Sequence, residues 1–411
     1  MKRLISSGLI LLCITVQAAS NFGTKLSERT LRLDYIFSGT DKTAEIALDA
    51  LSVSDIWAGR RINMDRLPLR GNGILEMKDA AEGEVLYMMS FSTLFQEWQT
   101  TEEATRVRKS FENVFQAPMP TVPVTITVTL FDINNAVEAQ MIHSVDPADI
   151  LIRPVGRNPV ECRYVHKSGP VEQCIDVAIV AEGYTAAEMD IFFRDAQAAF
   201  ESIMNHEPFG SMQDKFNFIA VPLVSEDSGV SIPKQGLWKN TAVSSNYDTF
   251  YSDRYLTTLR VKKLHDALDG IPYEHIVILA NTDNYGGGGI YNSYTLTTAH
   301  HPAFKPVVVH EFGHSFAGLA DEYYYDDMYV QYYYPGVEPW EQNITTMTDF
   351  GSKWEDMMGK DGVGLKEGGG YRSKGVWRAM DDCRMKTNTA PSFCPVCRRA
   401  IKKMIEFYAG E

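Results

Sequence analysis

Two histidines separated by three residues constrain this chain more than any other feature of its sequence. The motif His310-Glu311-Phe312-Gly313-His314 follows the apolar run Val307-Val308-Val309, and Phe316 and Leu319 extend an apolar stripe beyond it. Residues four apart on a helix lie one turn from each other on nearly the same face, so both imidazoles can reach one ion. The segment therefore predicts a packed helix over about residues 303–318 that offers two nitrogen ligands.

A third ligand is expected just after this helix. Catalytic zinc sites use three protein ligands and leave the fourth position to water. Gly318 can end the helix in a left-handed conformation and turn the chain back, which brings Asp321 or Glu322 within reach. We expect Asp321, whose short side chain suits a position just after a sharp turn, with Glu322 as the alternative. Either acid is otherwise a solvated side chain or a hydrogen-bond acceptor for a zinc-binding histidine.

Glu311 lies between the two histidines and need not bind the ion. A bound zinc ion lowers the pKa of a water molecule to near 7, and a neighbouring carboxylate can accept the proton and pass it to a leaving amine. The motif thus predicts hydrolysis of a peptide bond with Glu311 as general base, and one catalytic Zn²⁺ as the cofactor.

Length and charge limit the other possibilities. At about 150 residues per domain, 411 residues predict two or three packed units. The formal net charge of −14 removes the electrostatic attraction that drives binding to a phosphate backbone, so we expect no nucleic-acid partner.

The first residues have the pattern typical of a secretory signal peptide. Lys2 and Arg3 precede an apolar run from Leu4 to Val16, and small residues follow from Ala18. This pattern predicts a signal peptide at 1–18 and a chain that is secreted, periplasmic or held at the cell surface. A membrane anchor or a lipid on Cys13 is the alternative, and no later stretch is long and apolar enough to span a membrane.

Five cysteines follow the predicted signal. Cys162 and Cys174 flank a Ser-Gly-Pro turn between two β-rich runs, which favours a local disulfide. Cys383, Cys394 and Cys397 can form one disulfide with a spare thiol, or hold a second metal for which a fourth soft ligand is not evident. We favour the structural disulfide for this group.

Hydrophobic patterning divides the chain in two. Residues 25–154 contain alternating runs typical of half-buried strands, such as Leu31 to Phe37 and Val122 to Phe131, with one helix expected at 102–111, and they predict a β-sandwich accessory domain. Residues 160–411 are expected to form the catalytic domain. The segments expected there are strands at 175–181, 216–224, 275–280 and 290–298, the last as an exposed edge, and helices at 186–204, 254–268 and 303–318. The expected class is therefore α+β and multidomain.

The segment from His310 to Tyr323 resembles the active-site segment of the immunoglobulin-A peptidase family of metallo-endopeptidases. Residues 181–185, 253–256 and 285–292 support the resemblance, which covers about residues 174–399. It implies a metzincin-like α/β zinc-peptidase domain, in which Met385 is similar to the methionine turn beneath the metal. The usual metzincin spacing would place a glycine at 317 and a ligand at 320, where this chain has Ala317 and Ala320.

These observations predict an exported zinc metallo-endopeptidase that acts on proteins or peptides, host glycoproteins included. A different hypothesis is a surface adhesin or glycan-binding protein with a vestigial metal site, in which the β-rich domain carries the function. A third is a zinc amidase that acts on cell-wall peptide.

Overall fold

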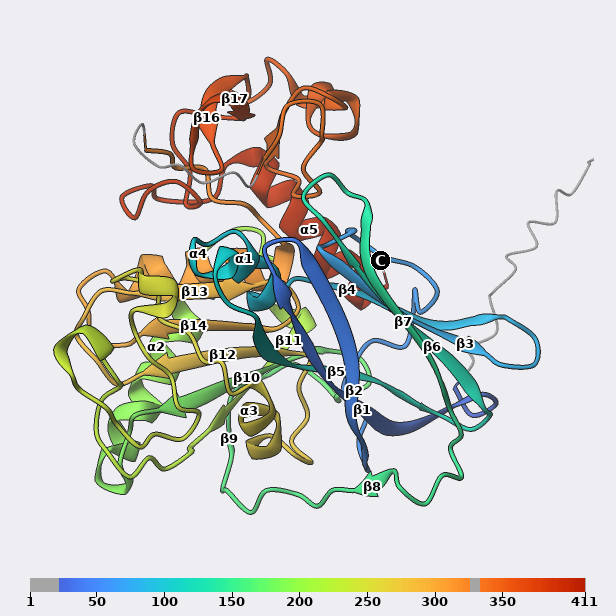
Figure 1. The fold of residues 1–411 in the computed structure, drawn as a ribbon. Coiled ribbons are helices and arrows are strands. Elements are labelled where there is room, and N and C mark those ends of the chain that lie inside the picture. Colours follow the sequence, from blue (N-terminus) through green and yellow to red (C-terminus); the bar gives the residue numbers. More distant parts are fainter. Residues whose placement is uncertain (1–21, 326–332, 411) are drawn as a thin grey trace, which may run out of the picture.

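The structure, a computed structural model, describes residues 22–325 and 333–410, so the predicted signal peptide at 1–18 lies outside the described residues. The first part of the chain forms two four-stranded sheets, with strand orders β5-β1-β2-β8 and β4-β3-β6-β7 (Figure 1). The strands are β1 Leu26–Thr40, β2 Thr43–Ser54, β3 Gly73–Asp79, β4 Val85–Phe91, β5 Lys109–Pro120, β6 Val124–Phe131, β7 Val137–Val145 and β8 Arg153–Pro154.

Aromatic side chains join the two sheets. Leu33, Tyr35 and Phe37 of β1 are fully buried. The ring of Phe37 lies 6.3 Å from that of Phe91 in the second sheet, and Phe91 lies 4.3 Å from Phe115 of β5. Two sheets that interdigitate their inner faces in this way form a sandwich.

The prediction of a helix at 102–111 is wrong. The helix of this region is α1 (Leu94–Gln99), which begins where the side chain of Thr93 accepts a hydrogen bond from the backbone of Gln96. Residues Glu103–Thr105 make a single 3₁₀ turn, and β5 then begins at Lys109 and pairs with β1. Pairing with a neighbouring strand thus overrides the local helical pattern.

A six-stranded sheet of order β13-β14-β12-β10-β11-β9 forms the centre of the second part. The strands β10, β11, β12 and β14 run parallel, and β9 and β13 are antiparallel to their neighbours. The elements are β9 Arg163–Lys167, β10 Ile175–Glu182, α2 Met189–Met204, β11 Phe216–Val221, α3 Val261–Ala267, β12 His275–Ala280, β13 Gly287–Ile290, β14 Tyr294–Thr298 and α4 Phe304–Ala317.

Both faces of this sheet are covered, which explains its continuous apolar strands. Every residue of β10, β11 and β12 is buried. Val177 and Ile179 share a core with α2 and α4, whereas Val180 and Ile278 on the opposite face belong to the core that contains the sandwich. The strands predicted at 175–181, 216–224 and 275–280 and the helices predicted at 186–204 and 303–318 are confirmed.

Two predictions for this part are wrong. The predicted helix at 254–268 is reduced to α3, because Tyr255 and Thr257 instead make isolated β-bridges. The predicted edge strand at 290–298 lies inside the sheet as β14, with all five residues buried, because the glycine-rich segment Gly287–Ile290 forms the outer strand β13.

The predicted disulfide between Cys162 and Cys174 is also wrong, because both thiols are free. Cys162 precedes β9, and Cys174 precedes β10. These strands lie on opposite sides of β11 and run in opposite directions, since β9 is antiparallel and β10 parallel to it. The two cysteines therefore lie at opposite ends of the sheet.

A small sheet and a long helix complete the chain. The strands β15 (Ile344–Thr345), β17 (Arg372–Arg378) and β16 (Lys366–Gly369) pair in that order, and α5 (Pro395–Ala409) follows. Figure 1 shows β16 and β17 at the top, with α5 leading back toward the sandwich. The protein is thus a multidomain α+β protein in which sheets predominate. Within residues 22–325 and 333–410, no helix combines the length and apolar character needed to cross a membrane.

Candidate metal centre

The helix α4 carries His310 and His314 on one face. Pro306 lies in its first turn, where a missing backbone N–H is tolerated. The helix ends at Gly318, which adopts the predicted left-handed conformation with φ of 57° and donates its N–H to the carbonyl of His314. Phe312 and Phe316 anchor the opposite face of the helix in the core.

The turn after α4 brings Asp321 back to the two histidines. Nε2 of His310 lies 3.0 Å from Nε2 of His314 and 3.0 Å from Oδ1 of Asp321, and Nε2 of His314 lies 3.2 Å from the same oxygen. Ligands about 2.0–2.1 Å from a tetrahedral ion are separated by about 3.3 Å. The three donor atoms therefore fit a metal ion with little rearrangement.

Backbone carbonyls fix the orientation of both imidazoles. Nδ1 of His310 donates to the carbonyl of Arg384 at 2.9 Å, and Nδ1 of His314 donates to the carbonyl of Leu319 at 2.5 Å. A carbonyl oxygen can only accept, so each Nδ1 must carry a proton. Each Nε2 is then the atom available to a metal, as is usual for metal-binding histidines.

Asp321 is held by its own contacts. Its carbonyl accepts the N–H of Gly370 at 2.8 Å, and Oδ2 of its side chain accepts a hydrogen bond from the hydroxyl of Tyr371. The side chain of Asn343 bonds both the N–H and the carbonyl of Ala320 at 2.8 Å. The other carboxylate oxygen, Oδ1, is thereby directed at the two histidines.

The charges of these residues depend on one another. Burial would raise the pKa of Asp321, but His314 and His310 outweigh this effect and hold the pKa well below its ordinary value. Burial would lower the pKa of His314, but Asp321 outweighs it and raises the pKa to about 9. Without an ion, His314 is therefore cationic at neutral pH, and a metal must displace its proton.

The carboxylate of Glu311 lies close to Gly287 of β13 and within electrostatic range of the three donor residues. A Cβ built on Gly287 would lie 2.8 Å from Oε1 of Glu311, so the glycine leaves room for the carboxylate. Burial raises the pKa of Glu311 above its ordinary value, although the two histidines lower it.

Met385 lies beneath α4. It is fully buried, and its sulfur lies 2.9 Å from the position that a Cβ on Gly313 would occupy. Its carbonyl accepts the N–H of Glu322 at 2.8 Å, which joins this turn to the segment after α4. The structure thus brings together His310, His314 and Asp321, with Glu311 and Met385 beside them. Glu322, the alternative third ligand, points instead to three cysteines.

Sequence reasoning missed two residues near these donors. Tyr371 follows three glycines and reaches Asp321, and that glycine run is the only local signal for it. Glu97 comes from α1 of the sandwich, accepts a hydrogen bond from Tyr255, and lies within electrostatic range of Asp321, His314 and Glu311. Burial raises the pKa of Glu97 to about 7.

Family models match most of the chain. The model described as IgA Peptidase M64 matches residues 164–364, and the model described as Peptidase M64 N-terminus matches residues 21–142. No curated protein is similar enough to the chain to count as a match. The first match contains the helix and all three donors of the candidate metal centre. The chain therefore belongs to the IgA peptidase M64 family, whose members are metallopeptidases.

Proposed function

We propose that the chain is an exported zinc endopeptidase in which His310, His314 and Asp321 hold the ion. The convergence of three donor atoms beside Glu311 is the observation that carries this proposal. Two imidazoles and a carboxylate form a donor set that suits zinc, and three protein ligands leave a position open for catalysis. When bound, the ion supplies Lewis acidity, which polarises the scissile carbonyl and acidifies water.

Glu311 is the proposed general base. It neighbours His310 on α4, and its side chain occupies space that a Cβ on Gly287 would otherwise fill. Burial raises the pKa of Glu311 above its ordinary value, which makes the carboxylate a stronger proton acceptor. Glu311 would accept a proton from the attacking water and deliver it to the leaving amine.

The remaining features support a metzincin-like arrangement. Met385 packs under Gly313, between the two histidines, and its backbone joins the segment that carries Asp321. We propose that Met385 supports the metal centre from below, as the methionine turn of that group does. Tyr371 would keep Asp321 oriented, because it binds the carboxylate oxygen that does not face the histidines.

The substrate is proposed to be a protein or peptide. The family's name points to immunoglobulin A, which makes host glycoproteins a suitable substrate class for the first assays. Export is proposed from the basic, apolar and small residues of 1–18, with a secreted, periplasmic or surface-held product.

The decisive experiment is Glu311→Gln in the full mature chain. The variant should retain the zinc content of the wild type and lose at least about 10²-fold in peptide cleavage, because the metal ligands are untouched and only the proton acceptor is removed. Glu172→Gln, at an exposed acid, is the matched control and should behave as wild type. Full cleavage by Glu311→Gln would refute this role and return attention to the adhesin hypothesis. Purified immunoglobulin A and a quenched peptide library are the probes.

A further inference from the structure

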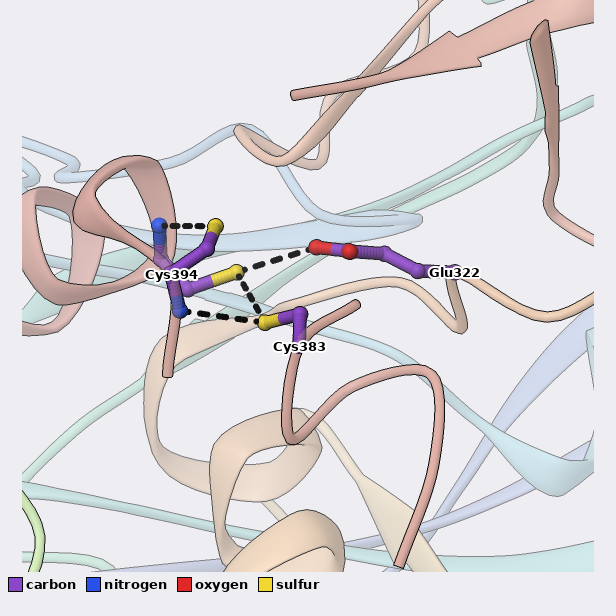
Figure 2. Close-up of side chains that lie close together, drawn as sticks. Glu322, Cys383 and Cys394 are labelled. Atoms are coloured by element: carbon purple, nitrogen blue, oxygen red, sulfur yellow. Dashed lines mark hydrogen bonds between the residues drawn. The ribbon is translucent and has the colours of Figure 1, made fainter. Parts of the chain in front are cut away.

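A second group of potential metal ligands lies on the other side of the segment that carries Asp321. The side chains of Cys383, Cys394, Cys397 and Glu322 are at most 4% exposed, and their ligand atoms all lie within 4.8 Å of one another. They come from three segments: the turn after α4, the loop before Met385 and the start of α5. Figure 2 shows Glu322, Cys383 and Cys394 directed toward one another.

The separations between these atoms match a tetrahedral ion better than a disulfide. The Sγ atoms of Cys383 and Cys397 are 3.7 Å apart, and Sγ of Cys397 lies 3.1 Å from Oε1 of Glu322. Thiolates about 2.3 Å from a tetrahedral zinc ion are about 3.8 Å apart, whereas a disulfide bond measures about 2.05 Å. All three cysteines are free, so the disulfide favoured from the sequence is wrong.

Backbone N–H groups donate hydrogen bonds to two of the three sulfur atoms. The N–H of Cys394 donates to Sγ of Cys383 at 3.2 Å, and the N–H of Cys397 donates to Sγ of Cys394 at 3.5 Å (Figure 2). Cys394 caps the first turn of α5, where the helix dipole favours a negative charge. Arg378 and Arg384 also act electrostatically on Glu322 and Cys383 respectively, which offsets part of the negative charge of the cluster.

The hydrogen bonding of the Glu322 carboxylate also favours a bound cation in this cluster. Oε2 of Glu322 is buried and has no hydrogen-bond partner among residues 22–325 and 333–410, while Oε1 accepts from the side chain of Asn343 at 3.0 Å. A buried carboxylate oxygen left without a partner is costly, and coordination to a metal removes that cost. The sequence shows no fourth soft ligand for the three thiols, and the structure supplies a carboxylate in its place.

We propose that Cys383, Cys394, Cys397 and Glu322 form a second, structural zinc site. Four protein ligands close the coordination sphere and leave no position for a substrate, which distinguishes structural from catalytic zinc. The site would join the start of α5 to the turns that carry Asp321 and Met385. The idea that this site helps to hold Asp321 and Met385 in place at a catalytic zinc rests on the proposed function. The second zinc site itself does not.

The first test compares the full mature chain with a His310→Ala/His314→Ala variant. Metal analysis should find about two zinc ions per wild-type chain and about one in the variant. X-ray absorption at the zinc edge of the variant should show sulfur neighbours at about 2.3 Å. Sulfur-bound zinc in equal, single amounts in both proteins would support this site while refuting the catalytic one. A single wild-type zinc without sulfur neighbours would overturn this site.

Variants of the cluster provide the second test. Glu322→Gln keeps the size of the side chain and should weaken retention of the sulfur-bound zinc against a chelator at least tenfold, whereas Cys162→Ser, at a half-buried thiol elsewhere, should have no effect. Unchanged retention in Glu322→Gln would refute its role as a ligand. Mass analysis of the unreduced, chelator-treated wild type should show three alkylatable thiols in the cluster, and a disulfide among them would overturn the proposal.

Discussion

Replacing Gly289 by alanine should force β13 away from α4, because no space exists for a methyl group between them. A Cβ on Gly289 would lie 2.2 Å from the carbonyl oxygen of Glu311 and 2.8 Å from Cβ of His314. The first of these contacts is with backbone, which cannot rotate aside. The strand or the helix must therefore shift, and the helix carries the proposed metal ligands.

The structure also sets the size of the effect. An added methyl group in a well-packed interior costs about 1–3 kcal/mol, and β13 is the outer strand of its sheet, so we expect about 2 kcal/mol. For domains of about 150–250 residues this corresponds to a fall in Tm of about 4–8 °C. Gly287→Ala differs, because its Cβ would meet the side chain of Glu311 at 2.8 Å. Its main effect should be on cleavage and not on stability.

Thermal unfolding and peptide cleavage, measured on the same preparations, separate the two substitutions. Gly156→Ala is the matched control, because a Cβ there meets no atom of the described residues within 4 Å. We expect Gly289→Ala to lose stability and cleavage, Gly287→Ala to lose mainly cleavage, and Gly156→Ala to match the wild type. A Gly289→Ala protein with the Tm and the activity of Gly156→Ala would show that β13 does not pack against α4 as described.

Three further predictions follow from the site and its surroundings. Asp321→Asn removes the carboxylate charge and should weaken zinc binding at the histidine site at least tenfold by chelator competition; unchanged affinity would exclude Asp321 as a ligand. Tyr371→Phe removes the hydroxyl that orients Asp321 and should cost about 10- to 100-fold in zinc affinity or in cleavage, with a normal Tm; a normal value for both would show that the hydroxyl has no orienting role. Burial raises the pKa of Glu274 to about 8, so the unfolded chain ionises near pH 4.5 while the folded chain does not, and stability should fall as the pH rises from about 5 to 8. Glu274→Gln keeps the oxygen that accepts the N–H of Arg60 and should remove about 2–3 kcal/mol of that fall, measured as Tm against pH; parallel curves for both proteins would contradict the shift.

Local rules were sufficient for the helix at the centre of the site. The spacing of His310 and His314, the apolar residues around them and Gly318 predict where α4 lies, which face it presents and how it ends, and all three are confirmed. Each of these features depends on residues within about one turn of each other, so no knowledge of the rest of the fold is needed.

The neighbouring features depend on the path of the chain and could not be predicted in the same way. Asp321 and Glu322 are adjacent in sequence and were considered as alternatives for one site, yet they diverge into two different clusters. The position of Glu322 is decided by Asn343 and by the start of α5, which lie more than 20 residues away. Likewise, the separation of Cys162 from Cys174 follows from the insertion of β11 between their strands.

The β-sandwich is in direct contact with the half of the chain that carries the candidate metal centre. Arg32 of β1 binds Asp266 near the end of α3 at 2.6 Å, and the side chain of Gln116 in β5 donates to the hydroxyl of Tyr273 at 2.8 Å. The hydroxyl of Tyr255 reaches Glu97 of α1, while the ring of Tyr255 packs against β13 on the face opposite α4. A chain lacking the sandwich would expose one face of the six-stranded sheet to water and remove one support of β13. The position of Glu311 therefore depends on residues of both halves, and the function of this protein has to be tested on the whole chain.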